Sequence, residues 1–174
     1  MSENNPTIAS LHDLLDYDAG RFTTAEIHLK TTLHEWEIIA FSLKLKTVLL
    51  RYIDYVQEHI KIMEGFFEEE KINALSISNR VMQAYIDDAN EKISMCKDQA
   101  IRDACLLACV QGINHFKISM YGTAAAFANT LGMEKQAAIF HEAEVNEKQI
   151  DDRLSQLAEH EINVQAKAPG ILEG

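Results

Sequence analysis

The chain has 174 residues, of which 47% are hydrophobic, and a formal net charge of −11 at pH 7. This length and composition predict one core in a single domain over residues 1–164, followed by a short tail over 165–174. The acidic balance disfavours binding to nucleic acids or anionic membranes, because such binding depends on Lys and Arg. With no apolar run of the roughly 18 to 20 residues that span a bilayer, and no signal-peptide pattern at the start, a soluble cytoplasmic protein is expected.

The first amphipathic stretch covers residues 22–40. Its apolar positions alternate in steps of three and four, as the buried face of a helix does. They are Phe22, Leu29, Leu33, Trp36 and Ala40. Glu26 lies on the same face, so its carboxylate is predicted to point inward. Pro6, which follows Asn5, suits a first helical turn, so this helix is expected to begin near Pro6.

The second stretch covers residues 45–66, and Ser42 is a good N-cap for it. Its stripe consists of Leu45, Val48, Tyr52, Tyr55, His59, Ile62 and Phe66. His59 is the inward polar residue of this helix. The following segment, residues 71–97, is too long for a tight hairpin, and it has a short apolar pattern of its own that begins after Ser78. It is therefore predicted to be a crossover that carries one short helix.

The third and fourth stretches complete a bundle. The third begins after the N-cap candidate Asp98, ends at Gly132, and has Asn114 and Lys117 on its apolar face. The fourth covers residues 140–157, with Glu147 inward and Asp151 one turn further on. All four long helices thus bring a polar group inward near mid-length. With two prolines and no alternating strand pattern, an all-α four-helix bundle with one long connection is predicted.

Several residues also have simple structural interpretations. Cys96, Cys105 and Cys109 form no Cys-x-x-Cys motif, which favours small apolar core residues over redox or zinc roles. His115 is predicted to lie off the central axis. A lone His59 is often a hydrogen-bonded core histidine, and a lone Glu26 can extend from a helix edge. Tyr52, Tyr55 and Tyr121 are expected to fill space in the core rather than to relay electrons.

The order and spacing of several segments resemble a known family. These segments are 24–26 in the first helix, 59–67 in the second, 101–106, 113–118, 121–123 and 131–132 in the third, and 146–148 in the fourth. Together they are similar to the YciE/YciF family of ferritin-like bacterial stress proteins. The resemblance implies a ferritin-like bundle with a short crossover helix between its second and third long helices, a dimer, and a two-metal site of the rubrerythrin kind. It implies no settled reaction.

The ligands expected from this resemblance are incomplete. Aligned with the family, two carboxylates of the third helix fall on Asn114 and Lys117, and a glutamate of the second helix falls on Tyr55. The remaining candidate ligands are Glu26, His59, Glu147 and Asp151. Di-iron bundles use about four carboxylates together with histidines. An inward Lys117 would repel a metal and attract a glutamate, so an ion pair with Glu26 or Glu147 is predicted in the metal's place.

Two functions remain open. The first is a non-enzymatic structural or interaction protein of the stress-associated type, with a degenerate site and no cofactor. The second is a metal-dependent oxidoreductase or iron-handling protein in which Glu26, His59 and Glu147 hold a single iron or manganese ion. The inward Lys117 favours the first function. A homodimer is expected in either case, with no partner protein identified.

Overall fold

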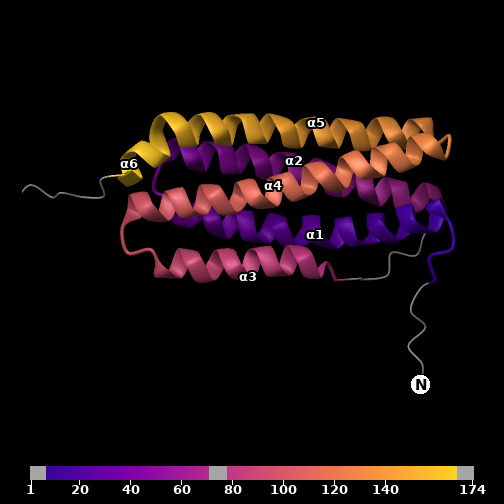
Figure 1. The fold of residues 1–174 in the computed structure, drawn as a ribbon. Helices are drawn as coiled ribbons and strands as arrows, with labels where there is room; N and C mark the ends of the chain where they lie inside the picture. Colours follow the sequence, from indigo (N-terminus) through magenta and orange to yellow (C-terminus); the bar gives the residue numbers. More distant parts are fainter. Residues whose placement is uncertain (1–6, 71–77, 168–174) are drawn as a thin grey trace, which may run out of the picture.

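The computed structural model describes residues 7–70 and 78–167, which form a helical bundle (Figure 1). Its four long helices are α1 (Leu11–Ile39), α2 (Leu43–Glu70), α4 (Gln99–Thr130) and α5 (Glu134–Leu157). The shorter α3 (Arg80–Met95) packs outside them against α4 and α1. The predicted all-α bundle, with a helix in its long crossover, is confirmed. Within the described ranges, no helix combines the length and apolarity needed to cross a bilayer.

Two helical hairpins make up the bundle. Short connections join α1 to α2 and α4 to α5, and α3 lies in the longer connection between the two hairpins. Contacts of α1 with α4 and of α2 with α5 then close the core. After α5 the chain continues through a π-helical turn, Ala158–Ile162, into α6 (Asn163–Lys167). The helical part therefore extends past residue 164, where a tail was expected to begin.

Helix termini follow local capping chemistry. Ser42 Oγ accepts a hydrogen bond from the Leu45 amide at 3.3 Å, and the Asp98 carboxylate caps α4, as predicted. Gly132 has a φ of 73°, the left-handed conformation expected at that helix end. The predicted start near Pro6 is wrong, because residues 7–10 are not helical and Ser10 caps α1 instead. Pro6 itself lies outside the described residues.

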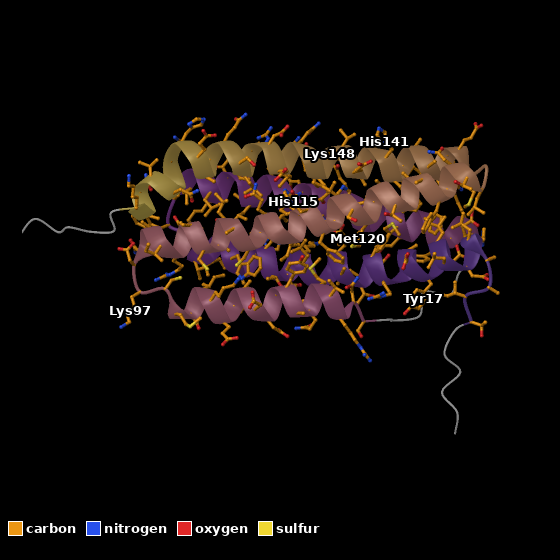
Figure 2. All side chains as sticks on the ribbon, viewed as in Figure 1. Tyr17, Lys97, His115, Met120, His141 and Lys148 are labelled. Atoms are coloured by element: carbon orange, nitrogen blue, oxygen red, sulfur yellow. The ribbon has the colours of Figure 1, made fainter. Side chains whose placement is uncertain are left out.

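The core has two apolar parts with a polar layer between them. One part, towards the α1–α2 connection, contains Trp36, Leu45 and Leu154. The other, towards the α4–α5 connection, contains Phe22 and Phe140, among others. The side chains in Figure 2 fill the space between the helices along the whole bundle. The inward polar residues predicted from the sequence lie between these two apolar parts.

Candidate functional site

Polar side chains from all four long helices meet in the core, at the level of α4 between His115 and Met120 in Figure 2. Glu26 comes from α1, His59 from α2, Lys117 from α4 and Glu147 from α5, and each is at most 1% exposed. Asn114, one turn before Lys117, is also fully buried. The predicted inward orientation of these five residues is confirmed. We call them, together with Tyr52 and Tyr121, the central cluster.

The ammonium group of Lys117 lies between the two carboxylates. Its Nζ is 3.0 Å from Oε2 of Glu26 and donates a hydrogen bond to Oε1 of Glu147. Nζ also lies 4.7 Å from the centroid of the Tyr52 ring, within the range of a cation–π interaction. The predicted internal ion pair is thus confirmed, and it joins Lys117 to both glutamates rather than to one.

Neutral donors occupy the other carboxylate oxygens. The Tyr121 hydroxyl donates to Oε1 of Glu26 at 2.5 Å, and the Tyr52 hydroxyl donates to Oε2 of Glu147 at 2.6 Å. Asn114 Nδ2 donates to the same Glu147 oxygen at 2.7 Å and to the Glu147 main-chain carbonyl at 2.9 Å. Buried charges are tolerated when such hydrogen bonds accompany the ion pair. Tyr52 and Tyr121 therefore fill space, as predicted, and also stabilise the two carboxylates.

The environment fixes the protonation of these groups. Burial raises the pKa of Glu26, but the Lys117 charge and the contacts with His59 and Tyr121 outweigh it, so the pKa is lowered overall. Burial lowers the pKa of Lys117, but Glu147 and Glu26 outweigh it, and the net shift is upward. Burial and the adjacent carboxylates raise the pKa of both Tyr52 and Tyr121 well above 10. Near neutral pH, Lys117 is therefore an ammonium, Glu26 a carboxylate and both tyrosines hydrogen-bond donors.

A two-metal centre, which the family resemblance implies, does not fit these residues. Among the residues that the structure describes, only Glu26, His59 and Glu147 bring three ligand atoms within 4.8 Å of one another. Two divalent ions need more carboxylates than this to bind them and to balance their charge. In addition, the Lys117 ammonium already pairs with one oxygen of Glu26 and one of Glu147.

Tyr55, which the family resemblance suggested at a ligand position, is not part of the central cluster. Its hydroxyl donates to Oε1 of Gln149 at 2.7 Å, and the Arg51 guanidinium stacks 4.7 Å from its ring centroid. Tyr52, on the same helix, contacts Glu147 instead. Tyr52 was part of the sequence stripe but was not a candidate site residue. The signal available for it was its spacing of seven residues, two helical turns, from His59.

Asp151 also lies apart from the central cluster. Its Oδ1 accepts a hydrogen bond from Gln111 Nε2 at 2.9 Å and lies 2.7 Å from His115 Nε2. The side chains of His115 and Asp151 are 61% and 26% exposed. His115 is thus off the central axis, as predicted, and Asp151 is its partner rather than a fourth ligand.

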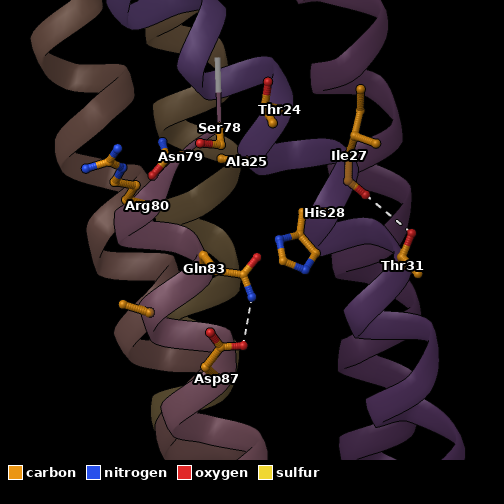
Figure 3. A pocket seen from close by; sticks show the side chains of 11 residues that line it. Thr24, Ala25, Ile27, His28, Thr31, Ser78, Asn79, Arg80, Gln83 and Asp87 are labelled. Atoms are coloured by element: carbon orange, nitrogen blue, oxygen red, sulfur yellow. Dashed lines mark hydrogen bonds between the residues drawn. The ribbon is translucent and has the colours of Figure 1, made fainter. Parts of the chain in front are cut away.

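A surface hollow of about 540 Å³ lies between α1 and α3 (Figure 3). His28 of α1 faces Gln83 of α3 across it, and Gln83 donates a hydrogen bond to Asp87 at 2.7 Å. None of the residues that line the hollow belongs to the central cluster. It is therefore a separate feature of the surface and gives no access to the buried charges.

Residues 10–167 match the family described as "Domain of unknown function (DUF892)". The chain belongs to the DUF892 family. It is similar to Protein YciF of Escherichia coli strain K12, with 37% identity over 86 residues, or 49% of this chain and 52% of YciF. The match therefore spans about half the length of this curated relative.

Solved structures show the same fold along nearly the whole chain. The crystal structure of the E. coli stress protein YciF aligns with a TM-score of 0.84 and 25% identity, covering 90% of this chain and 99% of YciF. YcfI of Rhodopseudomonas palustris, for which a structural role has been suggested, aligns with a TM-score of 0.82 and 22% identity, covering 89% and 97% of the two chains. The ferritin-like bundle and the YciE/YciF assignment are thus confirmed.

Proposed function

We propose that this DUF892 protein is a non-enzymatic structural or interaction protein of the YciF type, in which an ion-pair cluster has replaced a two-metal site. The observation that carries the proposal is the position of Lys117, whose ammonium group contacts both Glu26 and Glu147. The replacement retains a cation at the centre of the bundle. It does not retain a redox-active metal or an open coordination position.

Electrostatics supports this proposal. Two unit charges about 4 Å apart interact by about 4 kcal/mol at an effective dielectric constant near 20, so a divalent ion would meet about 8 kcal/mol of repulsion from Lys117. The repulsion would have to be overcome by ligands that are already hydrogen-bonded to Tyr52, Tyr121 and Asn114. Metal binding would therefore require the loss of several existing contacts.

Burial also argues against catalysis at this cluster. Lys117, Tyr121 and the other members are at most 1% exposed. A substrate would have to separate packed helices before it touched any of them. The protein would then act through its outer surface, and the cluster would keep the helices in register.

The cellular role is inferred from relatives. Because YciF of E. coli is described as a stress protein, we propose a stress-associated role for this chain as well. A cytoplasmic homodimer is the expected form. Sedimentation equilibrium of the full chain tests the dimer, and a concentration-independent monomer mass would exclude it.

Metal analysis tests the main proposal. Protein purified from cells supplemented with iron and manganese should contain far less than two metal ions per chain and should not accelerate ferrous oxidation. The variant Asn114→Glu/Lys117→Glu is the positive control, because it returns two carboxylates to the cluster and should gain metal. Two tightly bound irons in the parent protein would contradict the proposal.

A second candidate is a mononuclear iron or manganese protein with oxidoreductase or iron-handling activity. It is favoured by the convergence of Glu26, His59 and Glu147, since His59 Nδ1 lies 3.5 Å from an Oε1 of each glutamate. His59 Nε2 has no hydrogen-bond partner in the described part of the chain. Under this hypothesis one metal binds after Lys117 withdraws. Stoichiometric Mn(II) binding by the parent, strengthened in Lys117→Met, would favour it over the main proposal.

A further inference from the structure

Three cysteines gather between α3 and α4, away from the central cluster. Cys96 caps the C-terminus of α3, and Cys105 and Cys109 lie one turn apart on α4. All three are free thiols. The expectation that they are core residues holds only in part. Cys105 and Cys109 pack against the edge of the core, and none of the three is fully buried.

A hollow of about 320 Å³ opens beside Cys105 and Cys109. The neighbouring positions on α4 are the small residues Ala108 and Gly112, and the α3 side is formed by Tyr85, Asp88 and Lys92. The Tyr85 ring lies against α4 at Gly112, where a Cβ would be in ordinary contact with the ring at 3.6 Å. A small solute can therefore reach the thiols of Cys105 and Cys109 from solvent through this hollow.

The environment of these thiols disfavours a nucleophilic role. Burial raises the pKa of Cys96, Cys105 and Cys109, and proximity to another sulfur adds to the rise at Cys96 and Cys105. Such thiols remain protonated near neutral pH and react slowly with oxidants, since the thiolate is the reactive form. A soft metal ion can displace the protons, because thiolates are among its strongest ligands.

We propose that the hollow beside Cys105 and Cys109, called the thiol groove below, binds one thiophilic monovalent metal ion of the Cu(I) class between these two sulfurs. In this step each coordinating thiol releases its proton to solvent and forms a metal–sulfur bond, with no change in oxidation state. A two-coordinate ion needs its two sulfur ligands near each other, and residues one turn apart on a helix have Cβ atoms about 5 to 6 Å apart.

The same geometry disfavours zinc. Zn²⁺ in structural sites takes four ligands in a tetrahedron. Within residues 7–70 and 78–167, the one group of three or more ligand atoms that converges within 4.8 Å is in the central cluster and contains no cysteine. The thiol groove thus offers neighbouring sulfurs for a low-coordinate ion and no preformed tetrahedral site.

An anaerobic titration tests the proposal. The fully reduced, full-length protein would compete with a colorimetric Cu(I) chelator, and we expect one Cu(I) per chain. Cys105→Ser and Cys109→Ser should each weaken binding by about 100-fold or more, because the second sulfur no longer acts at high effective concentration. Cys96→Ser should leave the affinity nearly unchanged, because Cys96 does not line the hollow. Zn(II) should bind much more weakly than Cu(I).

Controls separate this site from other modes of binding. Ala108→Ser changes the same hollow without removing a sulfur and should leave the affinity unchanged, and circular dichroism melts would verify that each variant folds. If a cysteine variant fails to fold, the matching alanine substitution takes its place. Unchanged Cu(I) affinity in Cys105→Ser/Cys109→Ser would overturn the proposal, because the metal would then bind elsewhere. The proposal would also be overturned if the protein bound several Cu(I) ions and each cysteine substitution removed one of them, because each thiol would then bind its own ion.

Discussion

Two charged pairs join α4 to α5 near the middle of the bundle, and they differ mainly in burial. Lys117 and Glu147 are at most 1% exposed, whereas the side chains of His115 and Asp151 are 61% and 26% exposed. On the surface, water and salt screen a pair, and its net contribution is usually about 0 to 1 kcal/mol. In the core, each partner depends on the other, because a single buried charge is costly. We therefore expect the fold to depend on the buried pair much more than on the exposed pair.

The largest effect is expected for Lys117→Met. This change leaves Glu26 and Glu147 buried without their cation, and breaking such a pair typically costs about 3 to 5 kcal/mol. Urea unfolding near neutral pH measures the loss. Lys148→Met is the matched control, since Lys148 is an exposed lysine that pairs with Glu144 on the surface of α5. If Lys117→Met unfolds at the same urea concentration as the parent, the buried ion pair does not stabilise the fold.

Adding Glu147→Leu to Lys117→Met should recover part of this loss. The double variant removes one uncompensated carboxylate and leaves Glu26, which still accepts a hydrogen bond from Tyr121. Groups in direct contact typically show interaction energies of about 0.5 to 3 kcal/mol, and the two substitutions should be non-additive by an amount in that range. A double-mutant cycle measured by urea unfolding gives the value. Simple additivity would mean that the two side chains act independently.

Much of this site follows from sequence spacing. Alternating steps of three and four placed Glu26, His59, Lys117 and Glu147 on the inner faces of their helices, because an apolar stripe marks the side that packs against neighbours. The stripe is broad, however, so it did not distinguish Tyr52 from Tyr55. Only the packing of α2 against α5 determines which hydroxyl reaches Glu147.

The position of Asp151 has a similar explanation. Ile150 and Leu154 are fully buried and fill the core face of α5 beyond Glu147. Asp151, next to Ile150, is turned towards the edge where Gln111 and His115 meet it. The helix start was also misjudged, although Ser10 followed by Asp13 is a recognisable N-terminal signal. The prediction for Asp151 failed because tertiary packing determines where its side chain lies. The prediction of the helix start failed because Pro6 and Ser10 are competing local signals.

Stability should depend on pH in a way that reports the buried pair. The folded pKa of Glu26 is lowered from 4.5, so its contribution is present above pH 4.5 and is lost as the pH falls through the folded pKa. The folded pKa of Lys117 is raised from 10.5, so its contribution is present below pH 10.5 and is lost as the pH rises through the folded pKa. The cluster should therefore give constant stability between these limits.

Lys117→Met sharpens this pH test. Without the ammonium, burial favours the protonated form of Glu26, so acidification should relieve part of the damage in the variant. The difference in unfolding free energy between parent and variant should narrow as the pH falls from neutral towards 4.5. Urea unfolding at a series of pH values measures this. A constant difference across that range would show that Lys117 does not determine the ionisation of Glu26.

The smallest effect is expected for His115→Ala. His115 is largely exposed, and its interaction with Asp151 is an ion pair only when the imidazole is protonated, so the loss should be at most about 1 kcal/mol. Added salt should distinguish the exposed pair from the buried pair. The screening length falls to about 3 Å at about 1 M ionic strength, and buried pairs are screened much less than exposed ones. Salt should therefore remove most of the His115→Ala effect and preserve most of the Lys117→Met effect. Gln111→Ala is the control, since it removes the other partner of Asp151 without removing a charge. A His115→Ala loss as large as that of Lys117→Met would mean that burial does not set the difference between the two pairs.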